Sequence, residues 1–306
     1  MPSTRAYLAI EGFEDELKEE LGSGLISQHG QLFVANTPSR APAWAKNVWL
    51  SPQKFEIKSV SDGVKQLRSL APWWAVYSHR FHRRAQLIQD QLPRVKNPPI
   101  DFLAPLPARK LGSWTLLAPD RILASAECTS LFPNGDILFN EDKVAPPSRA
   151  YLKLWELFTI YGVRPRVGEK CIDLGATPGG WTWVLANPKI GCKVLAVDRA
   201  PLAENVAAMA GVEFMLRNAF TLKPEDVGSI DWLFSDIICY PEQLVELVQT
   251  WRESGLVKNF VCTIKFKGKT DHAVTAKLAS IAGARVQHLC HNKHELTWWL
   301  TREPGL

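Results

Sequence analysis

The second half of the chain alternates regularly between apolar runs and helix-like segments, and this alternation restricts the fold more than any other feature. Apolar runs that predict strands lie at 170–176, 193–198, 213–217, 231–237 and 259–266. Helices are expected at 148–162, with Ser148 as N-cap, and at 179–187, 241–254 and 271–284. Strands that alternate with helices form a doubly wound, mostly parallel α/β sheet. The last two strand-like runs, 284–291 and 294–302, are too close together for a helical crossover, so they predict an antiparallel hairpin.

The first half of the chain has shorter elements and predicts a smaller domain. Strand-like and helix-like segments alternate over residues 1–92, among them an acidic amphipathic helix at 13–22, and they indicate an α+β domain. Residues 93–147 are rich in proline and predict a connector with a β segment that turns at Asn134-Gly135. The remaining part, 148–306, is the α/β domain.

Composition and cysteine usage are those of an ordinary globular protein. The chain has 306 residues, of which 46% are hydrophobic and 22% are charged. Its longest apolar runs stop well short of the ~20 residues that a membrane-spanning helix needs, and its acidic start does not have the pattern of a signal peptide. Six cysteines are scattered singly without a CxxC pair, which is typical of a reducing compartment. We therefore expect a cytoplasmic protein.

Positive charge is concentrated in one part of the chain, although the net charge is only +5. Between Lys65 and Lys110 there are nine Lys or Arg residues and only two acidic residues. The segment 79–84, HRFHRR, mixes cations with an aromatic ring, as RNA-binding surfaces do. Arg80, Arg83 and Arg84 are therefore candidate RNA contacts, with a solvated basic face as the equal alternative.

The most informative segment is 171–181, CIDLGATPGGW. A hydrophobic strand ends near Asp173, and Gly175, Gly179 and Gly180 then form a tight turn into a helix. Such glycines allow the backbone to approach a ligand closely at the carboxyl edge of the sheet. The dinucleotide fingerprint G-x-G-x-x-G is absent, Pro178 stands in the loop, and no Lys-Ser or Lys-Thr follows as in a P-loop. These features disfavour a dehydrogenase and a P-loop protein.

The next strand ends in Asp198, whose carboxylate can accept hydrogen bonds from both ribose hydroxyls of an adenosine. The same residue would be expected in an NAD enzyme, and a strand-end acid that caps a turn is a further alternative. Trp181, on the helix after the glycines, is expected to form a wall of the same pocket.

Four charged residues are expected to converge at this edge: Lys153, Asp236, Lys265 and Glu295. Asp236 and Lys265 stand at the ends of two strands, Glu295 begins the last strand, and Lys153 lies on the helix that leads into the sheet. Two lysines and two acids that meet in a partly buried place stabilise one another. Each alone could instead be a solvated charge or a turn cap.

These motifs together resemble the FtsJ/RrmJ-type ribose 2′-O-methyltransferases. The resemblance rests on SRAYLKLWE, DLGATPGGW, the SD and IK pairs and the late glutamate, and within the superfamily it is strongest to the 23S rRNA cytidine 2′-O-methyltransferases. It implies a Rossmann-like S-adenosylmethionine-dependent methyltransferase sheet over 148–306 and a ferredoxin-like, degenerate THUMP-like N-terminal domain. It also implies a catalytic tetrad of Lys153, Asp236, Lys265 and Glu295.

The resemblance further assigns S-adenosylmethionine as cofactor, bound by Asp173, Gly175, Pro178, Gly179, Gly180, Trp181, Asp198, Asn218 and Asp236. Asn218 stands where family members often have an aspartate near the adenine. The implied substrate is large-subunit rRNA, with Arg149 as a further RNA contact. The same chemistry on tRNA or an mRNA cap, and an inactive protein that binds cofactor or RNA, are alternatives.

A ribose hydroxyl is a poor nucleophile at neutral pH, so it needs a base or a group that orients it. We expect Lys265 to act on the 2′-hydroxyl, with its pKa lowered by Lys153 and by the positive sulfonium of the cofactor. We expect no metal, because His288, Cys290, His291 and His294 alternate between strand faces and cannot converge.

Overall fold

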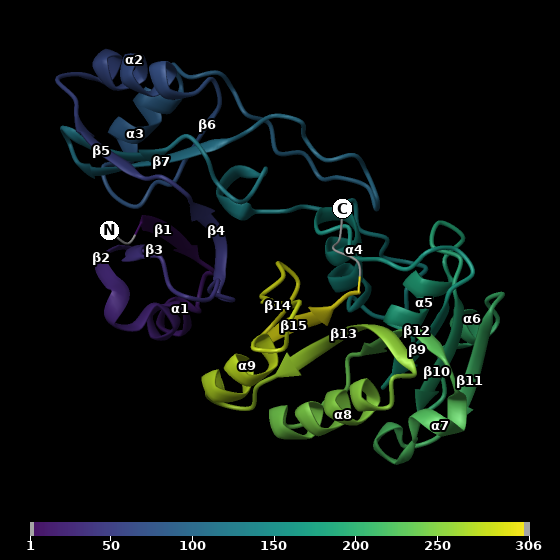
Figure 1. The fold of residues 1–306 in the computed structure, drawn as a ribbon. Helices are drawn as coiled ribbons and strands as arrows, with labels where there is room; N and C mark the ends of the chain where they lie inside the picture. Colours follow the sequence, from purple (N-terminus) through teal and green to yellow (C-terminus); the bar gives the residue numbers. More distant parts are fainter. Residues whose placement is uncertain (1–2, 303–306) are drawn as a thin grey trace. The chain divides into compact units, whose positions relative to one another are not determined.

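The computed structural model describes residues 3–302, which form two compact units (Figure 1). The first unit comprises the chain up to Asp101 together with Pro105–Phe139. The second comprises Phe102–Ala104 and the chain from Asn140 onward.

The first unit contains two four-stranded sheets. One has the strand order β2-β3-β1-β4 and is entirely antiparallel, and the other has the order β5-β8-β7-β6. The strands are β1 (Thr4–Ala9), β2 (Leu25–His29), β3 (Leu32–Asn36), β4 (Ala45–Trp49), β5 (Gln53–Glu56), β6 (Trp74–Val76), β7 (Gly112–Ala118) and β8 (Arg121–Ser125). The helices are α1 (Glu14–Leu21), α2 (Val60–Leu70) and α3 (His82–Gln89).

Helices α2 and α3 bury their apolar residues against the second sheet. Val64 and Leu67 of α2 and Ile88 of α3 share one core cluster with Trp74 and Trp114 of the sheet. Ser59 caps α2, since its hydroxyl accepts a hydrogen bond from the Asp62 backbone N–H at 3.1 Å.

The segment 93–147, which the sequence indicates as a connector with a β segment, is not a separate part of the fold. Its strands β7 and β8 pair with β6 and β5, so they complete a sheet of the first unit. The physical reason is that a hairpin alone cannot bury its apolar face, and here α2 and α3 cover it. Asn134 and Gly135, where the sequence predicts the turn of the β segment, have φ angles of 54° and 82° but lie in a short 3-10 helix, Pro133–Gly135. The strands β7 and β8 are instead joined by a turn at Pro119-Asp120, because both lie before the predicted turn.

The second unit is built on one seven-stranded sheet in the order β11-β10-β9-β12-β13-β15-β14. Its strands are β9 (Lys170–Leu174), β10 (Lys193–Asp198), β11 (Val212–Leu216), β12 (Ile230–Ser235), β13 (Val257–Lys265), β14 (Ala284–Gln287) and β15 (Glu295–Leu300). The first five pair in parallel, and β15 runs antiparallel to both β13 and β14. The predicted α/β class, the parallel sheet and the antiparallel hairpin are confirmed.

Helices cover both faces of this sheet (Figure 1). They are α4 (Tyr151–Ile160), α5 (Gly180–Ala186), α6 (Glu204–Ala207), α7 (Pro224–Val227), α8 (Pro241–Glu253) and α9 (His272–Ala279). The consecutive residues Trp298 and Trp299 of β15 point to opposite faces. The Trp298 indole N–H donates to the Leu278 carbonyl of α9, and Trp299 contacts Tyr161 at the end of α4. Thus α4 and α9 lie on opposite faces.

Helix α4 differs from the expectation in its start. It begins at Tyr151 with Ala150 at the N-cap position, and no side chain caps it. Ser148 is therefore not the N-cap; its hydroxyl instead lies close to Gly180. None of the helices within residues 3–302 is long and apolar enough to cross a membrane.

Candidate active site

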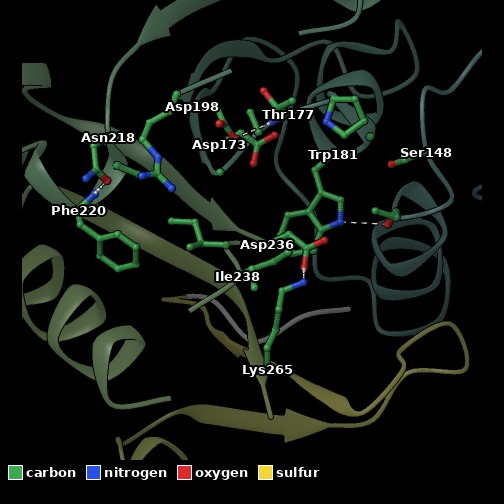
Figure 2. A pocket seen from close by; sticks show the side chains of 18 residues that line it. Ser148, Asp173, Thr177, Trp181, Asp198, Asn218, Phe220, Asp236, Ile238 and Lys265 are labelled. Carbon is green, nitrogen blue, oxygen red and sulfur yellow. Dashed lines mark hydrogen bonds and ion pairs between the residues drawn. The ribbon is translucent and has the colours of Figure 1, made fainter. Parts of the chain in front are cut away.

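A cavity of about 360 Å³ opens at the carboxyl ends of the parallel strands (Figure 2). The chain leaves β9 toward β10 on one side and builds β12 and β13 on the other, so β9 and β12 flank the topological switch point of the sheet. Open α/β sheets bind ligands at this place. The cavity is lined by Ser148, Ala150, Asp173, Gly175, Ala176, Thr177, Pro178, Gly180, Trp181, Asp198, Arg199, Asn218, Ala219, Phe220, Asp236, Ile237, Ile238 and Lys265.

The turn after β9 requires glycine for two reasons. Gly175 has a φ of 77°, in the left-handed region that side chains disfavour, and a Cβ there would collide with Ile237. Gly179 has a φ of 115° and precedes α5, where a Cβ would meet Val206. The turn thus brings bare backbone against the segment that follows β12.

Asp173 places a buried carboxyl at the floor of the cavity. Its Oδ2 accepts a hydrogen bond of 2.6 Å from the Thr182 hydroxyl on α5. Its Oδ1 is buried and has no hydrogen-bond partner among the residues that the structure describes. Burial raises the pKa of Asp173 to about 7, and the negative charge of Asp236 adds to this effect. A cationic group in the cavity could both fill the vacant acceptor and stabilise the carboxylate.

Asp198, the last residue of β10, borders the cavity on the next strand. Its Oδ2 accepts from the Thr177 backbone N–H at 3.0 Å and its Oδ1 from the Ala200 N–H at 3.1 Å. These bonds fix the carboxylate at the rim, and each oxygen keeps a further lone pair. Both the role expected for Asp198 and the alternative, a strand-end acid that caps a turn, are compatible with this geometry.

On the far side, Asn218 follows β11 and bonds locally. Its side-chain oxygen accepts from the Phe220 backbone N–H at 3.1 Å, and this contact holds the short turn that places the Phe220 ring at the cavity (Figure 2). With Ile237 and Ile238, the ring gives this end of the cavity an apolar character.

The four residues Lys153, Asp236, Lys265 and Glu295, called the tetrad below, come together as predicted. Lys265 and Glu295 are direct cross-strand partners of β13 and β15. Asp236 directly follows β12, which is the neighbour of β13. Lys153 projects from the first turn of α4. Side chains at such positions meet because strand register and the helix start bring them to the same edge.

The tetrad forms a closed ring of alternating charges. The Lys153 Nζ lies 3.0 Å from Asp236 Oδ1 and 2.6 Å from Glu295 Oε1. The Lys265 Nζ lies 2.7 Å from Asp236 Oδ1 and 3.2 Å from Glu295 Oε2. Lys153 and Glu295 are buried, with 7% and 6% exposure, so each needs its partners to offset the cost of removing a charge from water. Asp236 and Lys265 line the cavity, and the other two lie behind them.

The charge states of the tetrad correct one expectation. Burial alone would raise the pKa of Asp236, but Lys153 and Lys265 together with the hydrogen bonds hold it below the usual value. Burial alone would lower the pKa of Lys265, but Asp236 and Glu295 raise it above the usual value. The expected lowering of the Lys265 pKa by Lys153 is wrong, because the two carboxylates contact the ammonium directly. These residues favour the protonated form of Lys265.

One residue that contacts the tetrad is not predicted from the sequence. The Thr263 hydroxyl donates to Asp236 Oδ1 at 2.7 Å. Thr263 lies two residues before Lys265 on β13, and alternate residues of a strand face the same way. That period-two spacing was the only signal in the sequence that could have found it.

The structure gathers most of the residues predicted to bind the cofactor. All of them line the cavity except Gly179, which adjoins it as the N-cap of α5. The lining also contains Thr177, Arg199, Phe220 and the pair Ile237–Ile238, for which the sequence predicts no role, and Ser148, for which it predicts only a capping role. Ser148 precedes α4, and the others follow strand ends, where periodicity gives little signal.

The candidate RNA contacts are distributed over both units. Arg80 and Arg83 are exposed, and α3 begins between them at His82. Burial and the charge of Arg80 lower the pKa of His79, so this histidine adds little positive charge at neutral pH. In the second unit, Arg149 is exposed and pairs with Glu141 at 2.7 Å.

The histidine and cysteine residues near β14 form contacts of their own. The His288 Nε2–H donates to the Lys293 carbonyl at 2.9 Å, and burial lowers the pKa of His288 to about 4. Within the described range 3–302, no three His, Cys, Asp or Glu side chains are grouped so that they could hold a metal ion. All six cysteines are free thiols.

A doubly wound sheet with β15 antiparallel beside β13 and a cavity at its switch point defines the second unit as an α/β domain of the methyltransferase class. Residues 146–297 match the family model described as FtsJ-like methyltransferase, so this part of the chain belongs to the FtsJ-like methyltransferase family. The resemblance inferred from the motifs is confirmed.

Curated relatives carry the name of one rRNA-modifying group. Ribosomal RNA large subunit methyltransferase M of Azotobacter vinelandii is 34% identical over 176 residues, which cover 52% of this chain and 49% of that protein. The protein of the same name from Pseudomonas entomophila is 32% identical over 197 residues, which cover 59% and 54%. The chain thus spans about half the length of the curated relatives it matches. Among solved structures, an rRNA methylase from Streptococcus thermophilus is 15% identical with a TM-score of 0.33, over 45% of this chain and 88% of that one.

Proposed function

We propose that the protein is an S-adenosylmethionine-dependent methyltransferase that methylates the 2′-hydroxyl of a ribose in large-subunit rRNA. The observation that carries the proposal is the closed tetrad at the edge of a cavity formed by the FtsJ-like segment. A ring of two ammonium groups and two carboxylates is costly to bury, and its opening toward a ligand cavity favours a chemical role over a purely structural one.

The cavity suits S-adenosylmethionine, which when bound supplies an electrophilic methyl group. Asp173 would accept a hydrogen bond from its amino group, because Oδ1 is buried and lacks a partner among the described residues. Asp198 would accept from the ribose hydroxyls with its remaining lone pairs. Phe220 would pack against the adenine at the apolar end, next to Asn218.

The tetrad would then orient and activate the acceptor hydroxyl. Lys265 is the tetrad lysine that reaches the cavity, so its Nζ is the atom placed to contact a ribose oxygen. To accept the hydroxyl proton it must first lose its own, and a positive charge nearby in the cavity disfavours the ammonium form. Asp236 and Glu295 would hold the Lys265 side chain in place, and Lys153 would hold both carboxylates in position. In-line placement of the hydroxyl supplies much of the rate enhancement.

Large-subunit rRNA is the favoured substrate because the curated relatives share the name ribosomal RNA large subunit methyltransferase M. The first unit, with Arg80, Arg83 and Arg84, would contribute to RNA binding, and Arg149 would do so near the cavity. An rRNA substrate and six free thiols favour a cytoplasmic location. The same reaction on tRNA or an mRNA cap is the alternative outcome of the experiment.

The test is transfer of labelled methyl from S-adenosylmethionine to purified RNA fractions from cells that lack this protein. We expect label in large-subunit rRNA and none in tRNA. Label in tRNA alone would show that tRNA, and not rRNA, is the substrate. Binding of S-adenosylmethionine without transfer to any RNA fraction or ribosomal particle would contradict the proposed reaction.

A further inference from the structure

A tyrosine and a lysine meet on the surface beside the tetrad, and neither the cavity nor the tetrad includes them. Tyr240 follows β12 and directly precedes α8, and Lys267 follows β13. The Lys267 Nζ lies 4.6 Å from the centroid of the Tyr240 ring, a cation–π distance. The ring is still accessible, because Tyr240 is 55% exposed.

The segment from Asp236 to Tyr240 turns its large side chains alternately inward and outward. Ile237 packs against Gly175 of the cofactor turn, and Cys239 is buried. Ile238 is 77% exposed and lies at the cavity wall, and Tyr240 points outward two residues later. Single exposed apolar side chains are ordinary. Here, however, an isoleucine and a tyrosine are exposed together within four residues of Asp236, whose carboxylate belongs to the tetrad.

Positive charge accompanies these apolar side chains. Lys267 and Lys269 are both exposed. The Cα atom of Lys267 lies at most about 7 Å from that of Lys265, since two residues cannot extend further. Burial raises the pKa of Cys239, and the positive charges of Lys265 and Lys267 both counteract this rise, so the two ammonium groups lie near the same residue.

We propose that Ile238, Tyr240 and Lys267 seat the acceptor nucleotide, with the base stacked on the Tyr240 ring beside Ile238 and the adjacent phosphate bound by Lys267 and Lys269. The inference rests on the proposed function and specifies its substrate: an RNA nucleotide that is unpaired when it binds. An aromatic face stacks on any base, and lysine binds any phosphate, so this seat positions the ribose without selecting the base.

The test compares the purified full-length protein with Tyr240→Ala, Tyr240→Phe and Lys267→Gln in steady-state methyl transfer to large-subunit rRNA. Tyr240→Ala should raise the KM for RNA roughly tenfold or more, the loss expected for one stacked base. Tyr240→Phe keeps the ring and should stay within about twofold of the wild type. Lys267→Gln should lower the salt slope of RNA binding by about one. The Kd for S-adenosylmethionine should not change in any variant.

Lys277→Gln is the matched control, because Lys277 is an exposed lysine on α9 away from the seat. A KM for RNA that is the same in Tyr240→Ala and the wild type would overturn the inference while the proposed function stands. If Tyr240→Ala also lowers the melting temperature and weakens cofactor binding, the effect on RNA is structural. That result would overturn the inference as well. A wild type that methylates no RNA would refute the proposed function, and the seat with it.

Discussion

Asp173 lies in an environment very different from that of an ordinary surface carboxyl. It is 1% exposed, its pKa is raised to about 7, and one oxygen lacks a partner within the described part of the chain. Lys265 shows the opposite balance, because two carboxylates raise its pKa despite burial. Both residues are therefore poised to respond to a cation in the cavity: Asp173 would ionise more readily, and Lys265 would lose its proton more readily.

Cofactor affinity should depend on pH through Asp173. Above pH 7 the carboxylate is charged and can bind the cationic amino group of S-adenosylmethionine. Below pH 7 the free protein protonates Asp173, so affinity should fall as the pH falls and approach a tenfold loss per unit. Calorimetric titrations between pH 5.5 and 7.5, below the pKa of an α-amino group at about 7.7 to 8, measure this dependence.

Asp173→Asn supplies the control for that measurement. It should bind the cofactor roughly 10- to 100-fold more weakly at pH 7.5, the loss expected for a charge-assisted hydrogen bond of about 1.5–3 kcal/mol. It should also lose the pH dependence. A wild type whose affinity is flat over this range would contradict the role proposed for Asp173.

Lys265→Ala should lower kcat by at least about 10²–10⁴-fold, the usual contribution of a general acid or base, and change cofactor affinity little. Lys265→Arg separates two roles: arginine keeps the positive charge but cannot lose its proton. If Lys265 is the base, the arginine variant should be as slow as the alanine variant. Single-turnover methyl transfer gives both rates, and wild-type turnover by Lys265→Ala would remove this residue from the mechanism.

At the scale of the elements, the strand ends carry the site. Because β9, β10, β12 and β13 are parallel, their carboxyl ends meet at one edge, and the sequence already placed Asp173, Asp198, Asp236 and Lys265 at such ends. The turns between strands and helices escaped prediction, since Thr177, Phe220 and Ile238 belong to no periodic segment. The direction of the shift in the Lys265 pKa could not be predicted either, because it depends on the β13–β15 register that pairs Lys265 with Glu295. The prediction of Ser148 as N-cap is wrong because a local capping pattern does not contain the contact with Gly180, which is distant in sequence.

The turn after β9 should tolerate no side chain at Gly175. Gly175→Ala incurs a left-handed backbone cost of about 1–2 kcal/mol and a clash with Ile237 that should cost a further ~1–3 kcal/mol. Gly168→Ala is the matched control, since Gly168 has a φ of 82° and open space around its Cβ position. We expect Gly175→Ala to melt several degrees below Gly168→Ala and to bind cofactor more weakly. Equal melting temperatures would show that Ile237 yields to the added methyl.

At the scale of the whole molecule, the two units differ in how well the sequence predicted them. In the second unit, long apolar runs alternate regularly with helical segments, so the α/β fold can be predicted from the sequence over 148–306. The first unit has short strands. Strand β5 pairs with β8, about seventy residues later in the chain, and β6 pairs with β7, about forty residues later. Local patterns cannot reveal such distant pairing, so the sequence predicts only a connector with a β segment over 93–147.

Replacement of Arg80, Arg83 and Arg84 by glutamine should weaken RNA binding and flatten its dependence on salt. Each lost phosphate contact lowers the slope of log K against log salt by about 0.7–0.9, so three lost contacts should lower it by roughly two to three. Lys18, Arg40 and Lys58 are exposed cations elsewhere in the first unit, and their joint replacement is the control. Filter binding at several salt concentrations gives the slopes. The same slope in the wild type and in the variant that lacks the three arginines would show that they form a solvated basic face and do not contact RNA.

The central claim is that the tetrad directs methyl transfer to a ribose 2′-oxygen of large-subunit rRNA. The most direct measurement is nuclease digestion and mass spectrometry of large-subunit rRNA from cells with and without this protein, and from cells with the Lys265→Ala variant. We predict one nucleotide that carries a methyl on its ribose only when the wild-type protein is present. A methyl that depends on the protein but lies on a base, or one that persists with Lys265→Ala, would contradict the account.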